Sequence, residues 1–135
     1  MPNWVHTTIQ AEGDRKDLDQ FVNFSKSEGR EFDFNKYIPR PVEKDEDWYN
    51  WNWDNWGTKW NANYVEWDDE TKDHLMVRFE TAWSRISNEL WEAIKAKFPT
   101  LKFTFEADEE AGFFHCNTDN VNGLIVDIKG ERELS

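Results

Sequence analysis

The alternation of apolar and polar positions predicts β-strands in three parts of the chain. Residues 4–11, 74–83 and 101–107 place apolar or β-branched side chains at nearly every second position. Successive side chains of a strand point to opposite faces, so this period is typical of a sheet with one buried and one open face. We therefore expect three strands that bury the same side of a sheet.

Apolar residues at a helical spacing predict two helices. The first begins after Asp14 and ends near Gly29, and the second is capped by Ser84 or Ser87 and stopped by Pro99. The apolar stripes are Leu18, Phe21 and Val22 in the first helix and Ile86, Leu90, Trp91, Ile94 and Phe98 in the second. Because such a stripe buries one side of a helix, we expect both helices to pack on the sheet.

The remaining segments complete the predicted sheet. An extended segment at 31–38 is ended by the prolines of residues 39–41, and shorter strands are expected at 111–117 and 124–128, with an Asn-Gly turn at 122–123. The resulting order is β-α-β, an insert, and β-α-β-β. It predicts an α+β fold, a ferredoxin-like split βαβ sandwich with a mainly antiparallel sheet, two helices on one face and a Trp-rich insert.

The length of the chain bounds its organisation. A chain of 135 residues corresponds to one domain, so we expect a single domain over 1–135, with the insert at about 43–73 and a polar tail at about 130–135. Aromatic residues make up 16% of the chain, whereas disordered chains are poor in them. Long-range disorder is therefore not expected.

The insert has an unusual composition. Residues 48–67 hold six of the nine tryptophans and two of the three tyrosines, interleaved with five asparagines. Trp, Tyr and Asn favour strands, turns and loops over helices. We therefore expect a turn at 55–57 and a strand at 58–65.

The charge balance restricts the partners. The chain has 28 Asp and Glu against 16 Lys and Arg, a formal net charge of −12. Such a balance argues against binding nucleic acid or acidic membranes and permits a basic partner or the imitation of a polyanion, although acidity also keeps a Trp-rich protein soluble. The candidate acidic surface consists of Glu43, Asp45, Glu46, Asp47, Glu66, Asp68, Asp69, Glu70, Asp108, Glu109 and Glu110.

Catalytic and metal-binding signals are weak. His6, His74 and His115 lie far apart in sequence, and the single Cys116 excludes an internal disulfide and a cysteine-rich zinc site. No Gly-x-Ser-x-Gly, Walker or dinucleotide motif is present. We expect no catalytic residue, no metal and no cofactor, although Cys116 with His6 or His74, or Ser84, stays open as a nucleophile.

Targeting signals are also missing from the sequence. No apolar run approaches about 18 residues, and the first residues do not resemble a signal peptide. A single cysteine fits a reducing compartment. We expect a protein of the host-cell cytoplasm that does not contact a membrane.

The best binding candidate is a Trp/Asn patch in and beside the insert. Tryptophan rings stack on bases or cations, Asn reads a polar edge, and a Lys or Arg neutralises a phosphate. The candidate residues are Trp56, Lys59, Trp60, Asn61, Arg78 and Trp83. The alternative is that these rings form a second core packed on the sheet.

Four segments, at residues 1–5, 34–41, 55–62 and 79–84, resemble the YubB-like family of plasmid and bacteriophage proteins. The two specific motifs are Trp56-Gly57-Thr58-Lys59-Trp60-Asn61-Ala62 and Thr81-Ala82-Trp83-Ser84. The resemblance spans about residues 1–105 and implies a ferredoxin-like domain from a mobile element, with no established reaction. The family usually has prolines after the second motif, where Arg85 and Ile86 stand here.

These features favour a non-enzymatic binding protein that inhibits a host factor, plausibly a defence component. We expect its acidic surface to imitate nucleic acid and to occupy the basic groove of a host protein, because a net charge of −12 repels a polyanionic ligand. The alternative is a nucleotide sequestered in a Trp/Asn-lined pocket, and a further alternative is a small hydrolase or nuclease. Direct nucleic-acid binding is not expected, and a homodimer stays open.

Overall fold

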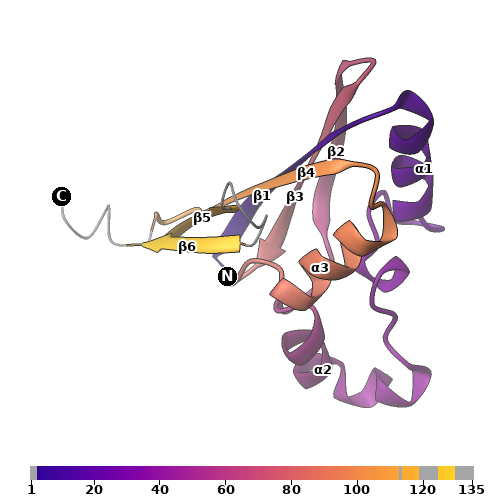
Figure 1. The fold of residues 1–135 in the computed structure, drawn as a ribbon. Helices are drawn as coiled ribbons and strands as arrows, with labels where there is room; N and C mark the ends of the chain where they lie inside the picture. Colours follow the sequence, from indigo (N-terminus) through magenta and orange to yellow (C-terminus); the bar gives the residue numbers. More distant parts are fainter. Residues whose placement is uncertain (1–2, 113, 119–124, 130–135) are drawn as a thin grey trace.

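The computed structural model describes residues 3–112, 114–118 and 125–129, and within them one six-stranded sheet forms the frame of the protein (Figure 1). The strands follow the order β2-β3-β1-β4-β5-β6, and all neighbours are antiparallel. Their bounds are β1 (Trp4–Glu12), β2 (Asn63–Thr71), β3 (His74–Ala82), β4 (Lys102–Glu109), β5 (Phe114–Thr118) and β6 (Ile125–Lys129).

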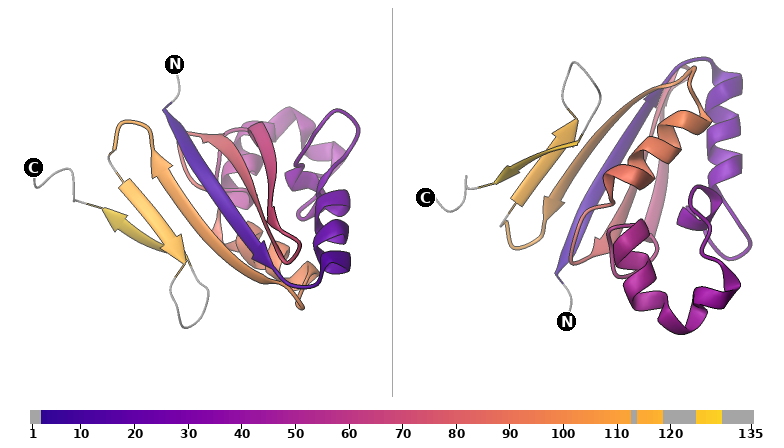
Figure 2. Two further views of the ribbon diagram at one scale, coloured as in Figure 1. Left: turned by 90° about the horizontal axis from the view of Figure 1, so that it is seen from above. Right: turned by 60° about the horizontal axis from the view of Figure 1, so that its bottom comes forward.

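Two helices cover one face of this sheet. Helices α1 (Arg15–Ser25) and α3 (Asn88–Lys97) lie side by side on it, and the opposite face is open (Figure 2). The segment between α1 and β2 holds two short 3-10 helices, η1 (Phe34–Lys36) and η2 (Val42–Asp47), and the helix α2 (Trp48–Asn55). This segment lies beyond one end of α3, away from the sheet edge formed by β6.

The topology confirms the predicted α+β, ferredoxin-like fold. Strand β3 lies between β1 and β2, so the β1-α1-β2 unit is split, and β3-α3-β4 forms the second unit. Strands β5 and β6 extend the sheet beyond β4. The central strands follow the alternation seen in the sequence: in β1, Val5, Ile9 and Ala11 are fully buried, while His6 is exposed.

Aromatic rings make up much of the core between sheet and helices. Phe21 of α1 is fully buried and makes edge-to-face contacts with Phe98 and Phe103, at centroid distances of 5.5 and 5.1 Å. Trp91 of α3 packs on Phe105 at 5.4 Å. Each buried ring of this kind contributes about 1.5–3 kcal/mol relative to leaving it in water.

Of the two serines predicted to cap the second helix, Ser87 caps it. The Ser87 hydroxyl accepts a hydrogen bond from the backbone N–H of Leu90 at 3.0 Å, so Ser87 is the N-cap of α3. Ser84 instead accepts a hydrogen bond from Thr81 through its carbonyl oxygen. The predicted stripe of Ile86, Leu90, Trp91, Ile94 and Phe98 is buried.

The extended segment predicted at 31–38 is wrong. The structure places the 3-10 helix η1 there, because the Asp33 carboxylate accepts a hydrogen bond from the backbone N–H of Asn35 and caps the turn. The strand that completes the first βαβ unit is β2, about thirty residues further along the chain. Phe34 is still buried, now from a helical turn rather than from a strand.

The expectation that the insert avoids helix is also wrong over its first part. Residues 48–55 form α2, in which buried Asn52 donates to the carbonyl of Lys59 and accepts from Arg40. These contacts override the weak helix propensity of the segment. The turn at 55–57 is confirmed: Gly57 has a φ of +79°, and a Cβ there would lie 2.7 Å from the backbone nitrogen of Ser87. The predicted strand at 58–65 starts later, at residue 63.

The remaining predictions concern the end of the chain and the membrane. The two short strands are present as β5 and β6, and the turn at 122–123 and the tail at 130–135 lie outside the described residues. None of the helices in the described part of the chain combines the length and apolar composition needed to cross a bilayer.

Candidate functional site

A pocket of about 370 Å³ opens where the segment between α1 and β2 folds back on itself. It is lined by Arg30, Asn35, Arg40, Trp48, Trp56, Trp60, Asn61 and Asn63. Two arginines, three tryptophans and three asparagines therefore face one cavity, and no carboxylate lines it. In a chain with 28 acidic residues, this lining departs from the overall composition. We call this cavity the Trp/Asn/Arg pocket.

A buried carboxylate supports the floor of the pocket. Asp33 is 8% exposed and accepts hydrogen bonds from Ser27 Oγ at 2.7 Å and from the backbone N–H of Asn35 at 2.9 Å. The side-chain amide of Asn61 donates to the same carboxylate at 2.8 Å. Burial raises the pKa of Asp33, but hydrogen bonds from Ser27, Asn61 and Asn35 outweigh it and hold the pKa below its ordinary value. A charged, hydrogen-bonded carboxylate thus lies behind the lining residues Asn35 and Asn61 and is not itself part of the lining.

Asn61 is locked in place by this arrangement. Its Oδ1 accepts hydrogen bonds from the backbone N–H groups of Phe34 at 3.0 Å and of Ala62 at 2.8 Å, while Nδ2 binds Asp33. The residue is 4% exposed. Asn61 therefore joins the η1 turn to the start of β2 and shapes the pocket more than it offers free hydrogen-bonding groups.

The inner wall is formed by Trp56 with Arg40 above it. Trp56 is 2% exposed, and its Nε1 donates to the carbonyl of Ile38 at 2.9 Å. The guanidinium carbon of Arg40 lies 5.9 Å from the centroid of the Trp56 ring. Arg40 is further held by Asn52 at 2.9 Å and by Asp45 at 3.3 Å. Its position is set before any ligand arrives.

Arg30 supplies a cation of a different kind. It is exposed, and its Nη1 donates to the carbonyl of Ala62 at 3.3 Å. Within residues 3–112 and the two described C-terminal strands, Arg30 forms no ion pair. An arginine presents five N–H donors, so most of this guanidinium is available to an anion.

The outer wall continues into a row of aromatic side chains. Lys59 Nζ lies 4.6 Å from the centroid of Trp60 and 4.2 Å from that of Trp83. Trp60 lies 6.1 Å from Trp4, and Trp4 lies 5.7 Å from Tyr64. We call Trp83, Lys59, Trp60, Trp4 and Tyr64 the aromatic row. Trp83 and Tyr64 have φ values of +72° and +52°, a conformation that bulky residues rarely adopt.

The structure brings together most of the predicted Trp/Asn patch. Trp56, Trp60 and Asn61 line the pocket, and Lys59 and Trp83 lie beside it. The exception is Arg78, which lies on the open face of β3. Several lining residues were not predicted: Arg30, Asn35, Arg40, Trp48 and Asn63. Arg30 lies in none of the four segments that carry the family resemblance. Arg40 lies in one of them, but the resemblance implied no binding role for it, and only the folding back of the chain brings both arginines to the pocket.

Arg78 does not line the pocket. Its Nη2 lies 2.6 Å from Glu66 Oε1 and 3.3 Å from Asp68 Oδ2, both on the neighbouring strand β2. The hydrogen bond that Arg78 donates to Glu66 raises the pKa of Arg78. Its charge is therefore shared with two carboxylates of the open sheet face.

The predicted acidic surface is spread over several parts of the molecule. Glu43, Asp45, Glu46 and Asp47 are exposed on η2, and Glu66, Asp68, Asp69 and Glu70 are exposed on β2. The prediction that Glu109 belongs to the acidic surface is wrong, because the residue is only 5% exposed. Strand β4 extends to Glu109, and the alternation of its side chains places this one on the buried face of the sheet. Its neighbours Asp108 and Glu110 are exposed.

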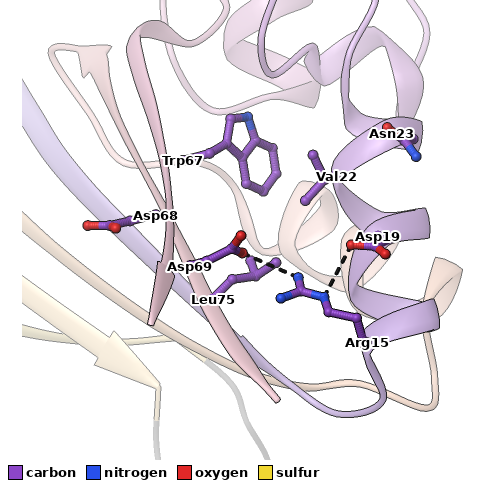
Figure 3. Close-up of a pocket in the computed structure, with 8 residues that line it drawn as sticks. All are labelled: Arg15, Asp19, Val22, Asn23, Trp67, Asp68, Asp69 and Leu75. Carbon is purple, nitrogen blue, oxygen red and sulfur yellow. Dashed lines mark hydrogen bonds and ion pairs between the residues drawn. The ribbon is translucent and has the colours of Figure 1, made fainter. Parts of the chain in front are cut away.

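A second pocket, of about 260 Å³, lies between α1 and β2 (Figure 3). Trp67 and Val22 form its apolar side, and Arg15 extends from α1 toward β2. Arg15 Nε lies 3.2 Å from Asp19 Oδ1, and Arg15 Nη2 lies 3.3 Å from Asp69 Oδ1. The one arginine of this lining is thus already paired with two carboxylates. We call this cavity the α1/β2 pocket.

The histidines and the cysteine do not form a nucleophile–base pair. His6 lies 2.7 Å from Glu80, His74 lies 2.9 Å from Gln10, and His115 contacts Asp108. Cys116 is fully buried, so it is not accessible to a substrate. Among the described residues, no group of three or more His, Cys, Asp or Glu is arranged to hold a metal ion.

Comparison with known proteins places the chain in a family. The family model described as "Ferredoxin-like domain in Api92-like protein" matches residues 55–132, more than half of the chain. The chain therefore belongs to this family, in agreement with the observed topology. No curated protein and no solved structure matches the chain.

Proposed function

We propose that this member of the ferredoxin-like family is a non-enzymatic binding protein that holds a nucleotide in the Trp/Asn/Arg pocket. The observation that carries the proposal is a lining with two arginines, three tryptophans and no carboxylate in a chain of net charge −12. An aromatic base and an anionic phosphate are the two groups that such a lining recognises.

The energies of these contacts are sufficient for useful affinity. Stacking a base on an aromatic side chain is worth about 1–3 kcal/mol, and a hydrogen bond to a charged group adds about 1.5–3 kcal/mol. The negative charge of the whole protein opposes phosphate binding, but salt screens it beyond about 8 Å. Arg30, which has no carboxylate partner among the described residues, acts at hydrogen-bonding distance, where its attraction outweighs the screened repulsion. Arg40 is already paired with Asp45 and adds less. This local effect is why the pocket takes precedence over the nucleic-acid mimic expected from the net charge.

The biological setting belongs to the same proposal. The motifs shared with the YubB-like proteins of plasmids and bacteriophages support an origin in a mobile element. A protein that withdraws a nucleotide without converting it would inhibit a host factor that depends on this nucleotide, for example in defence. We place this action in the cytoplasm of the host cell.

Calorimetric titration with the four nucleoside 5′-monophosphates tests the proposal. We expect at least one of them to bind with a micromolar to submillimolar Kd. Arg30→Gln and Trp60→Ala should each weaken binding about tenfold or more. Lys16→Gln removes the same charge from an exposed position of α1 and should leave the Kd unchanged. No binding of any monophosphate at about 1 mM, or equal losses in Arg30→Gln and Lys16→Gln, would overturn the proposal.

The nucleic-acid mimic is retained as a second candidate because of η2. Its four carboxylates are exposed, and Glu43 and Glu46 form no ion pair within the described residues. A partner with a basic groove would meet a row of exposed carboxylates of which, in the described part of the chain, only Asp45 is paired, with Arg40. The test is competition with a DNA duplex for a lysine-rich peptide: Glu43→Lys with Glu46→Lys should abolish it, and Trp60→Ala should leave it unchanged. The opposite result would exclude this candidate.

A further inference from the structure

The aromatic ring of Trp60 belongs to two surfaces at once. It lines the Trp/Asn/Arg pocket, and it lies 6.1 Å from Trp4, which in turn lies 5.7 Å from Tyr64. Trp60 is 36% exposed and Tyr64 is 73% exposed. The pocket therefore continues into a second aromatic surface formed by Trp4 and Tyr64, which we call the platform.

Tyr64 occupies an unusual position for a large aromatic residue. Its φ is +52°, and the pairing of β2 with β3 shifts register between Asn63 and Glu66, on either side of it. A non-glycine residue in the left-handed region costs about 1–2 kcal/mol. The strain is not repaid by burial, because most of the ring is exposed. Strain of this kind is common at ligand-binding positions.

A third cation lies next to the shared ring. Lys59 Nζ is 4.6 Å from the centroid of Trp60, and the described residues contain no carboxylate paired with it. The pocket already contains Arg30 and Arg40. Cations thus lie both inside the pocket and beside Trp60, the ring that the pocket shares with the platform.

We infer that the ligand is a dinucleotide rather than a mononucleotide. One base stacks in the pocket against the tryptophans, the second stacks on the platform, and the linking phosphate lies within reach of Lys59. This inference rests on the proposed function of the pocket. The shared chemistry is two bases joined by a phosphate, which a dinucleotide and a longer single strand both present.

The charges beyond the platform favour the shorter ligand. Strand β2 continues past Tyr64 with Glu66 and Asp68, and Glu80 is the register partner of Asn63 on β3. Glu66 and Asp68 share the single positive charge of Arg78, so this pair of carboxylates stays net negative, and each further phosphate would approach it on a protein of net charge −12. A longer oligonucleotide is therefore repelled by these carboxylates more strongly with each added nucleotide, whereas a dinucleotide ends at the platform.

Titration with adenosine monophosphate, the linear dinucleotide pApA and a deca-adenylate tests this inference. We expect pApA to bind about tenfold or more tighter than the monophosphate, as one additional stacked base provides. Tyr64→Gly removes the ring and fits the left-handed backbone, so it should reduce pApA affinity to the level of the monophosphate without unfolding the protein. Tyr64→Phe should retain the full affinity.

The outcomes separate the inference from the proposal on which it rests. Equal affinity for the monophosphate and pApA, or an unchanged Kd for pApA in Tyr64→Gly, overturns the dinucleotide and leaves the pocket proposal intact. Deca-adenylate binding as tight as pApA overturns the preference for the shorter ligand. Failure of all three ligands and of the other three nucleoside monophosphates overturns the proposed function itself.

Discussion

The two pockets of this protein contain similar residue types and offer opposite chemistry. Each combines tryptophan with arginine, and their volumes are about 370 and 260 Å³. In the α1/β2 pocket, Arg15 is paired with Asp19 and Asp69. In the Trp/Asn/Arg pocket, Arg30 has no carboxylate partner among the described residues, and Asp33 lies behind the lining with its charge satisfied by hydrogen-bond donors.

This difference shows that the presence of an arginine does not define an anion site. Two exposed carboxylates satisfy Arg15, so a phosphate would have to displace them and would meet their repulsion. A phosphate approaching Arg30 displaces only water and a long hydrogen bond to a backbone carbonyl. If the proposed function holds, the neutralisation of each cation decides which pocket accepts an anionic ligand.

The largest effect, on the free energy of unfolding, is expected when the Asp33 carboxylate behind the lining of the Trp/Asn/Arg pocket is removed. Asp33→Ala leaves the donors of Ser27, Asn35 and Asn61 without their acceptor, and a loss of about 3 kcal/mol in unfolding free energy should follow. Urea denaturation measures this change. Asp19→Ala removes an exposed carboxylate from the α1/β2 pocket and should cost far less. Equal losses in the two variants would show that Asp33 does not support the fold.

The same carboxylate makes a pH-dependent contribution to stability. The pKa of Asp33 is lower in the folded protein than in the unfolded chain, so its stabilisation is present above the unfolded pKa of about 3.9 and is lost as the pH falls through the folded pKa. Asp33→Asn should remove this part of the acid dependence in denaturation curves measured from pH 7 downward. Identical acid profiles for the two proteins would contradict the lowered pKa.

An intermediate effect is expected when a carboxylate is introduced into the lining. Asn63→Asp keeps the shape of the side chain and places a negative charge beside the arginines, so the Kd for adenosine monophosphate should rise about tenfold. Asn23→Asp makes the same change in the α1/β2 pocket and serves as the control. If both variants bind as the parent does, the missing carboxylate is not what distinguishes the two pockets.

A smaller effect should appear when the α1/β2 pocket is made to resemble the other one. Asp19→Asn combined with Asp69→Asn frees Arg15 beside Trp67, and weak phosphate binding should appear there. The indole N–H resonance of Trp67 reports it in two-dimensional NMR spectra titrated with inorganic phosphate. A resonance that stays unmoved in the double variant, as in the parent, would mean that a free arginine alone does not create the site.

The smallest effect is expected at Arg78. Arg78→Gln removes an exposed ion pair of the open sheet face, and neither the Kd for adenosine monophosphate nor the midpoint of urea denaturation should change beyond experimental error. Calorimetry and denaturation on the same sample check both. A loss of nucleotide affinity would return Arg78 to the binding site in which the sequence placed it.

The sequence predicted the parts of the fold that depend on local periodicity. The alternation at residues 74–83 and 101–107 located β3 and β4, and the four-residue spacing from Ile86 onward located α3. These patterns are reliable because one face of each element is buried along its whole length. Phe32 and Phe34 misled the same reasoning: both rings are buried, but from a bend and a 3-10 turn rather than from a strand.

Local composition was a poorer guide where tertiary contacts compete with propensity. The tryptophans and asparagines of residues 48–55 favour extended structure, yet buried Asn52 bonds to Arg40 and Lys59 and holds the segment helical. Glu109 looked like part of an acidic turn, but β4 runs two residues beyond the predicted strand and turns it to the core side. In both cases the deciding partners come from other elements.

By itself, then, the sequence determined an α+β fold with a ferredoxin-like order of elements, a net charge of −12 and a surplus of tryptophan. Only the tertiary structure decided which charges stay uncompensated. Arg30 lines the Trp/Asn/Arg pocket without a carboxylate partner among the described residues. Arg40 is paired with Asp45, and Arg15 and Arg78 are neutralised because β2 lies beside α1 and β3. The physical reason is that periodicity records burial along one element, whereas the field at a site depends on the distances between charges on different elements.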